Sequence, residues 1–101
     1  MLELFIQKAI QSFNNATINN MWTEKDNSLQ ATFQFKDFVQ AFAFMTEVAF
    51  HAEKMNHHPE WTNTWNKVAF KLSTHDAGNT VTEKDRKLAK AIDNIAERFP
   101  K

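Results

Sequence analysis

The feature that most constrains the fold is the spacing of apolar residues, which changes repeatedly between an extended and a helical period. Residues 29–35 alternate strictly between apolar and polar side chains, and this predicts a strand with one buried face. Residues 61–65 and 68–74 alternate in the same way and predict two further strands. A partner for the first strand is predicted at residues 18–23, joined to it by a polar hairpin loop at residues 24–28.

Three other segments place apolar residues three and four positions apart, which predicts amphipathic helices. They comprise residues 2–13, a long segment that begins at Asp37, and a third segment at residues 82–99. Pro59 disfavours helical geometry at the residue before it, so the second helix should end near residues 55–57. The order αββαββα therefore predicts an α+β fold, in which helices pack on one face of a four-stranded, mostly antiparallel sheet.

Capping patterns support the starts of the second and third helices. Asp37 is followed three residues later by Gln40, and Thr82 by Asp85, as in capping boxes. The main apolar stripe of the second helix is expected to cover the sheet and contains Phe38, Phe42, Met45, Ala49 and Ala52. A second stripe lies on another flank of this helix and needs a cover of its own. It contains Val39, Ala43 and Phe50.

Length, charge and composition exclude several classes of protein. A chain of 101 residues is expected to form one domain, residues 1–101, around a single core. Its 12 basic and 12 acidic residues give no net charge, which argues against a nucleic acid partner. Without cysteine there is no disulfide and no thiolate nucleophile. The chain starts without a signal-peptide pattern and its most apolar stretch, residues 38–50, is too short to cross a bilayer, so a soluble, cytoplasmic protein without a membrane partner is expected.

Three of the four histidines are the best candidates for chemistry, because His57, His58 and His75 fall at the ends of predicted elements. His51 lies on the polar side of the second helix and is expected to be a surface residue. With an ordinary pKa of about 6.5, histidine can donate or accept a proton near neutral pH. Any one of them alone could be an ordinary surface or core residue, but three at one end of a sheet favour an acid–base site.

A metal site is the main alternative, since three imidazoles can hold zinc. Adjacent residues of an extended segment point to opposite sides, so His57 and His58 are not expected to converge with His75 on one ion. Nucleophilic catalysis has less support, because no Gly-x-Ser-x-Gly motif occurs and Ser73 lies near His75 only in sequence. A single glycine also excludes a glycine-rich phosphate loop. The residues alone thus predict a small α+β domain with a candidate histidine acid–base site and no named substrate.

The segment from Glu53 to Trp61, together with residues 63–68 and 72–78, resembles the signature of the pterin-4a-carbinolamine dehydratases. That signature has a charged residue four positions before His-His-Pro, followed by an aromatic residue, a histidine and an aspartate. The matching residues, in that order, are Glu53, His57, His58, Pro59, Trp65, His75 and Asp85. The resemblance covers nearly the whole chain and has two departures. Asn56 stands where many members have aspartate, and the turn at residues 78–81 is one residue longer than usual.

This resemblance implies that the chain is a dehydratase, which converts 4a-hydroxytetrahydrobiopterin (pterin-4a-carbinolamine) to quinonoid dihydrobiopterin and water. Such an activity recycles the pterin cofactor of aromatic amino acid hydroxylases, and it needs proton transfer but no organic cofactor or metal. The resemblance further implies homodimers or homotetramers that associate through the second helix. A non-catalytic role, as a helix-mediated binding or dimerisation partner of another protein, is the alternative class.

The resemblance also implies roles for individual residues. His57 and His75 are expected to form the acid–base pair, while His58 fixes the pterin. The further candidates for substrate binding are Glu53, Asn56, Pro59, Trp61, Ser73, Thr74, Asp76 and Asp85.

Some of these residues have competing explanations. Trp61 or Trp65 could line one side of the site for the flat pterin, or could simply pack in the core of the sheet. Glu53 could orient a histidine or be a solvated helix residue. Asp85 could act at the site or serve only to cap the third helix.

Overall fold

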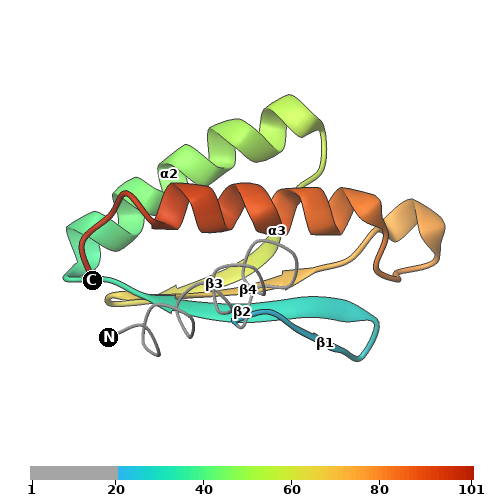
Figure 1. Ribbon diagram of the computed structural model, residues 1–101, viewed down its shortest axis with the longest axis horizontal. Helices are drawn as coiled ribbons and strands as arrows, with labels where there is room; N and C mark the ends of the chain where they lie inside the picture. The colour runs from blue at the N-terminus through green and yellow to red at the C-terminus, as the bar shows by residue number, and fades with distance from the viewer. Residues whose placement is uncertain (1–20) are drawn as a thin grey trace, which may run out of the picture.

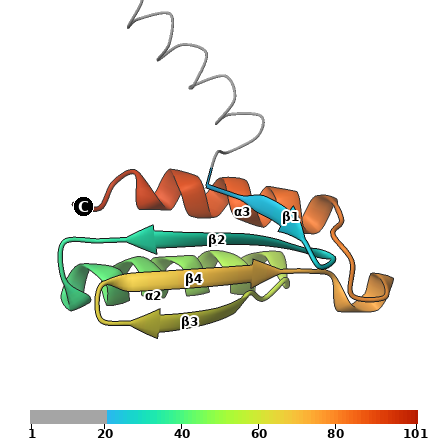
Figure 2. The ribbon, with the colours of Figure 1, turned by 90° about the horizontal axis from the view of Figure 1, so that it is seen from below.

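A computed structural model describes residues 21–101, which form an antiparallel sheet covered on one face by two helices (Figure 1). In chain order the elements are β1 (Thr23–Lys25), β2 (Ser28–Gln34), α2 (Phe38–Met55), β3 (Glu60–Thr64), β4 (Lys67–Leu72), a 3₁₀ turn (His75–Ala77) and α3 (Glu83–Ala96). The strands lie in the order β1-β2-β4-β3, as seen from below in Figure 2. The predicted α+β architecture is confirmed, and the helix predicted at residues 2–13 lies outside the described residues.

The alternation predicted for residues 29–35 marks the buried face of the sheet. Its apolar members Leu29, Ala31, Phe33 and Phe35 are all buried, and β2 pairs with β4 so that Ala31 lies opposite Phe70. Phe44 of α2 packs onto these rings, with its centroid 4.5 Å from that of Phe35. Sheet and helix therefore share one aromatic core, which holds the ends of the strands in a defined place.

The hairpin between β1 and β2 is shorter than predicted. Glu24 and Lys25 belong to β1 and pair with β2, so the loop consists only of Asp26 and Asn27. Both loop residues have positive φ, 53° and 59°, as a two-residue hairpin of this kind requires. Asp and Asn tolerate that conformation better than most residues, which explains why so short a loop forms without glycine. The predicted loop at 24–28 is therefore wrong, and residues 18–20 of the predicted strand lie outside the described part.

The hairpin between β3 and β4 also turns within two residues, because Thr64 pairs with Lys67. Trp65, which the alternation predicted to be in a strand, is in this turn with φ +52° and is 65% exposed. The amide of Asn63 donates to the carbonyls of Trp65 and Lys67 and holds the turn. Trp65 consequently lies at the end of β3 opposite to the end that follows the histidines.

Helix α2 begins and ends where the sequence predicts. Asp37 is its N-cap and accepts a hydrogen bond from the backbone N–H of Gln40 over 2.8 Å. At the other end Asn56 adopts the left-handed conformation, φ 55°, three residues before Pro59. The chain therefore leaves the helix abruptly and enters the histidine segment in extended form.

The buried face of α2 differs from the predicted one. Its buried residues are Ala41, Phe44, Val48 and Ala52. Of the predicted main stripe, Phe38, Phe42 and Ala49 are exposed, so the predicted phase of the helix is wrong. The reason is that this helix is apolar on nearly all sides, and apolar spacing alone then cannot tell which side contacts the sheet. The exposed apolar residues form what we call the α2 outer face: Phe38, Val39, Phe42, Ala43, Ala49 and Phe50.

Helix α3 has the capping box that the sequence predicts at Thr82 and Asp85. It ends at Ala96, three residues before the predicted end at Phe99, whose ring nonetheless packs against the core. Neither of the described helices is long and apolar enough to span a membrane.

Candidate active site

The pairing of β3 with β4 brings two distant segments to one end of the sheet. Glu60, the first residue of β3, lies opposite Lys71, near the end of β4, in an antiparallel ladder. Residues 57–59, which precede β3, and residues 73–75, which follow β4, must therefore lie at the same sheet end. These two segments contain all three histidines that the sequence predicts to be functional.

His57 is the most enclosed of the three and is only 9% exposed. Its backbone N–H donates to the carbonyl of Ala52, which ties it to the last turn of α2. Its ring nitrogen Nε2 lies 2.6 Å from Oδ1 of Asp85, the third residue of α3. The histidine segment and the first turn of α3 are thus joined through one buried contact.

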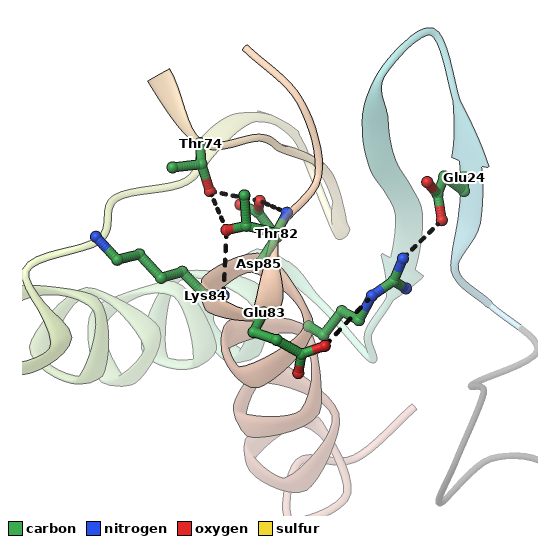
Figure 3. A network of polar contacts seen from close by, with 7 residues as sticks. Glu24, Thr74, Thr82, Glu83, Lys84 and Asp85 are labelled. Carbon is green, nitrogen blue, oxygen red and sulfur yellow. Dashed lines mark hydrogen bonds and ion pairs between the residues drawn. The ribbon is translucent and has the colours of Figure 1, made fainter. Parts of the chain in front are cut away.

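Asp85 is completely buried and uses its two oxygens for different purposes. Oδ2 accepts hydrogen bonds from the backbone N–H of Thr82, at 2.9 Å, and from the hydroxyl of Thr74, at 2.7 Å (Figure 3). Oδ1 is directed to His57. The N-terminus of a helix stabilises a negative charge at this position. The two explanations for Asp85 are therefore compatible, because Oδ2 caps α3 while Oδ1 contacts a histidine.

The partners of Asp85 determine which nitrogen of His57 carries the hydrogen. An ionised aspartate only accepts, so Nε2 of His57 must donate to Oδ1. The neutral ring then has a lone pair on Nδ1, which has no hydrogen-bond partner among the described residues. In this neutral form Nδ1 of His57 can accept a proton, as a general base requires.

His58 is placed differently from its neighbour, as expected for adjacent residues of an extended segment. Its Nε2 lies 2.9 Å from Oε1 of Glu53 in the last turn of α2. Both side chains are largely exposed, at 58% and 80%. A pair so open to water contributes little to folding stability, on the order of 0–1 kcal/mol. Glu53 is therefore both solvated and in contact with a histidine.

His75 is exposed and begins the 3₁₀ turn after β4. Its Nδ1 lies 3.2 Å from Oδ1 of Asn79, a residue that the sequence analysis did not single out. An amide oxygen accepts, so Nδ1 donates to it, and Nε2 has no hydrogen-bond partner among the described residues. Asn79 has φ +59° and follows Gly78, φ +84°, so the turn after the 3₁₀ segment supplies the partner of His75.

The remaining predicted residues surround these contacts. Asn56 is the left-handed cap of α2, a position that asparagine tolerates well, while Pro59 is half-buried. Trp61 packs on Phe70 with ring centroids 5.7 Å apart, as the core explanation predicted. Ser73 is half-buried beside Thr74. Trp65, at the far end of β3, is not brought to the histidines.

A shallow hollow of about 340 Å³ opens beside this network, at the start of α3. It is lined by Thr74, Asp76, Ala77, Thr82, Glu83 and Lys84. It includes Thr74 and Asp76, two of the predicted binding residues, and Figure 3 shows Lys84 extending from the same turn. Sequence reasoning missed Glu83 and Lys84, because nothing distinguishes them from ordinary charged residues of a helix start. Within residues 21–101, no group of three or more histidine, aspartate or glutamate side chains is placed to hold a metal ion.

Comparison with known sequences places these residues in a family context. The family described as "Pterin 4 alpha carbinolamine dehydratase" matches residues 5–95. A protein of Rhizobium leguminosarum bv. trifolii is 53% identical over 79 residues, which cover 76% of this chain and 77% of the relative. A protein of Rhizobium meliloti is 57% identical over 78 residues, covering 76% and 74%. Both relatives are named provisionally as pterin-4-alpha-carbinolamine dehydratases.

Two solved structures share the fold. A "transcriptional coactivator/pterin dehydratase" from Brucella melitensis superposes with a TM-score of 0.75 at 42% identity, over 83% of this chain and 92% of that one. A "pterin dehydratase-like protein", described as a RuBisCO assembly factor in the alpha-carboxysome, superposes with a TM-score of 0.61 at 25% identity, over 74% and 86%. Relatives of this fold are thus described both by a dehydratase name and by binding roles.

Proposed function

Because the chain belongs to the pterin-4a-carbinolamine dehydratase family, we propose that it removes water from a 4a-hydroxytetrahydropterin by histidine acid–base catalysis. The observation that carries this proposal is the contact of His57 with the buried carboxylate of Asp85. A buried carboxylate on one ring nitrogen holds an imidazole in one orientation and one tautomer, and leaves the other nitrogen for proton transfer. The natural substrate we propose is 4a-hydroxytetrahydrobiopterin.

The proposed reaction breaks one C–O bond and moves two protons. The 4a-hydroxyl leaves as water after it receives a proton, and the adjacent ring nitrogen loses its proton as a double bond forms between that nitrogen and C4a. No electrons are gained or lost overall, and the product is the quinonoid dihydropterin. An acid and a base on the protein therefore suffice, and such catalysis contributes about 10²- to 10⁴-fold in rate.

The geometry supports a division of roles among the histidines. We assign the base to His57, because its Nδ1 is unpartnered among the described residues while Nε2 is held by Asp85. We assign the acid to His75, which acts in its protonated form: Nδ1 donates to Asn79, and Nε2 supplies the proton to the leaving hydroxyl. His58 lies on the solvent side with Glu53 and is proposed to bind the pterin ring rather than to transfer its proton.

The remaining binding residues are proposed from their places around these histidines. Thr74 and Asp76 line the hollow next to Asp85, and Ser73 precedes them. Asn56, Pro59 and Trp61 flank the two adjacent histidines along the chain.

The proposed activity is tested by following the absorbance of a freshly generated 4a-carbinolamine with and without the purified protein. We expect the protein to accelerate the decay of the carbinolamine and the appearance of the quinonoid product in equal amounts. An unchanged decay at micromolar protein would rule the proposal out.

The exposed pair of His58 and Glu53 leads to a prediction about substrate affinity. His58→Ala and Glu53→Gln should raise KM several-fold and leave the melting temperature nearly unchanged, because neither side chain is buried. Steady-state dehydration kinetics and thermal unfolding measure the two effects separately. Lys54→Gln, on the same exposed helix turn, is the control and should alter neither. A loss of kcat at unchanged KM would contradict the binding role of His58.

We also propose that the chain forms homodimers or homotetramers through the α2 outer face. This face exposes three large aromatic side chains, Phe38 at 49%, Phe42 at 56% and Phe50 at 72%. Ala43 and Ala49 lie between them and would allow a second helix to approach closely. An exposed apolar surface of this kind is unfavourable in water unless another surface covers it. A second copy carries the same uncharged residues and can cover it by two-fold symmetry.

Substituting the outer face should therefore dissociate the assembly. Phe50→Glu introduces a charge where the two helices would meet, and we expect a smaller particle mass by light scattering after size-exclusion chromatography. Thr32→Glu, on the exposed face of the sheet, is the matched control and should leave the mass unchanged. A wild-type protein that is monomeric at high micromolar concentration would contradict the proposal.

The alternative function, helix-mediated binding to another protein, is supported by the same outer face and by the names of two structural relatives. It requires no intact acid–base site. The dehydration assay separates the two, because a purely binding protein would not accelerate decay of the carbinolamine.

A further inference from the structure

The polar network behind His57 extends two residues beyond Asp85, to Thr74 and Thr82. The hydroxyl of Thr74 lies 2.6 Å from that of Thr82 and 2.7 Å from Oδ2 of Asp85 (Figure 3). Lys84 directs its backbone N–H to the hydroxyl oxygen of Thr82 over 3.3 Å. Thr74 is buried, so each of its polar contacts takes the place of water.

The direction of every hydrogen bond in this network follows from the donors available. A hydroxyl has one hydrogen, and an ionised carboxylate has none. Thr74 must therefore give its hydrogen to Asp85, and it can only accept from Thr82. The hydroxyl of Thr82 consequently donates to Thr74 and accepts from Lys84. Only one arrangement satisfies all the groups, and in it the hydrogen bonds converge on Asp85: Thr82 donates to Thr74, Thr74 donates to Oδ2, and the ring of His57 donates to Oδ1.

From this converging arrangement we infer that Thr82 is a positioning residue for His57, acting through Thr74 and Asp85. Its hydroxyl occupies the acceptor site of Thr74, which leaves the hydrogen of Thr74 directed at Oδ2. With Oδ2 occupied by Thr74 and by the backbone of Thr82, Oδ1 is the oxygen that faces Nε2 of His57. The hydroxyl at position 82 thereby stabilises the tautomer that exposes Nδ1. The expected change in dehydration rate rests on the proposed function, whereas the expected change in the tautomer of His57 does not.

Removing the hydroxyl should disturb the tautomer and the rate together. In Thr82→Val the buried oxygen of Thr74 loses its donor, which weakens the hydrogen bond that Thr74 donates to Oδ2 and loosens the position of the carboxylate. We expect kcat to fall about 10-fold at unchanged KM, which matches the smaller losses seen when the outer partners of metal-binding histidines are removed. Nitrogen-15 chemical shifts of His57 should show a larger share of the Nδ1–H form. Thr82→Ser should restore both values.

Two further variants separate positioning from helix capping. Thr82→Gly removes the hydroxyl with little loss of capping, and it should reproduce the changes if Thr82→Val does not fold. Asp37→Ala removes the N-cap bond of α2 far from the histidines, so it should lower the melting temperature without altering kcat or the tautomer. A folded Thr82→Val or Thr82→Gly protein with the wild-type tautomer overturns the inference. Because the chemical shifts need no substrate, that result is distinct from a failure of the dehydratase assignment.

Discussion

An Asp85→Asn variant is expected to fold but to dehydrate the carbinolamine about 10²- to 10⁴-fold more slowly, which is the contribution of an entire general base. The reason lies in the donors around the carboxylate. The backbone N–H of Thr82 and the hydroxyl of Thr74 both point at Oδ2, so the amide oxygen of the introduced asparagine must take that position. Its NH₂ group then faces Nε2 of His57 and donates to it.

This reversal changes the tautomer of His57. A nitrogen that accepts a hydrogen bond cannot carry the hydrogen, so the neutral ring must carry it on Nδ1. The nitrogen that should accept the substrate proton is then already protonated. Dehydration kinetics measure the loss, and circular dichroism reports whether the fold is retained. Asp37→Asn is the matched control, because asparagine caps a helix as well as aspartate does and position 37 has no contact with the histidines. Activity within twofold of wild type for Asp85→Asn would contradict the role of Asp85.

A His57→Gln variant should lose activity to a similar extent, again about 10²- to 10⁴-fold. The amide nitrogen of glutamine lies at nearly the same distance from the backbone as Nε2 of histidine, so it can still donate to Oδ1 of Asp85. The buried carboxylate therefore keeps a partner, and folding should be retained. Glutamine has no group that accepts a proton near neutral pH, so the base is removed selectively.

The control for this variant is His51→Gln, a substitution of the same kind on α2, outside the proposed site. It should leave kcat and KM unchanged. Comparing kcat of the two variants at saturating pterin shows whether the loss belongs to position 57. If His57→Gln retains the wild-type kcat, His57 is not the base and the acid–base assignment must move to the other histidines.

The parts of the fold that could be predicted from sequence are those with a single strong periodicity. Residues 29–35 alternate so strictly that only one face can be buried, and α3 has polar and apolar sides that are clearly distinct. The face of α2 could not be predicted, because Phe38 and Phe42 satisfy the same spacing as the buried residues. Its true orientation depends on the aromatic rings of the sheet that receive Phe44.

A turn could be predicted only where its residue type, such as glycine, favours the backbone conformation that the turn requires. Gly78 marks its turn correctly, but Trp65 occupies positive φ without any signal in the sequence. A bulky aromatic residue in that conformation is rare. The alternating pattern therefore led to a predicted strand that included Trp65. Asn63 holds the turn with two hydrogen bonds to nearby carbonyls, a local side-chain interaction that apolar periodicity does not report.

The candidate site was predicted at the level of residue types and not at the level of connections. The signature contains His57, His75 and Asp85, and the antiparallel order of the strands implies that the two histidines share one sheet end. Asp85 contacts His57 with one oxygen and caps α3 with the other. The sequence could not predict this double role, because the contact joins residues 28 positions apart. Thr82 resembled an ordinary helix cap, because its contact with Thr74 also joins separate segments and leaves no trace in the sequence pattern.

The most direct test of this account is the state of the His57 ring in the wild-type protein. Nitrogen-15 chemical shifts of the ring should be recorded before and after addition of biopterin, a stable pterin with the same ring system. We predict a neutral ring protonated on Nε2, with the Nδ1 signal moving most when the pterin binds. A ring protonated on Nδ1, or signals that do not respond to saturating pterin, would contradict it.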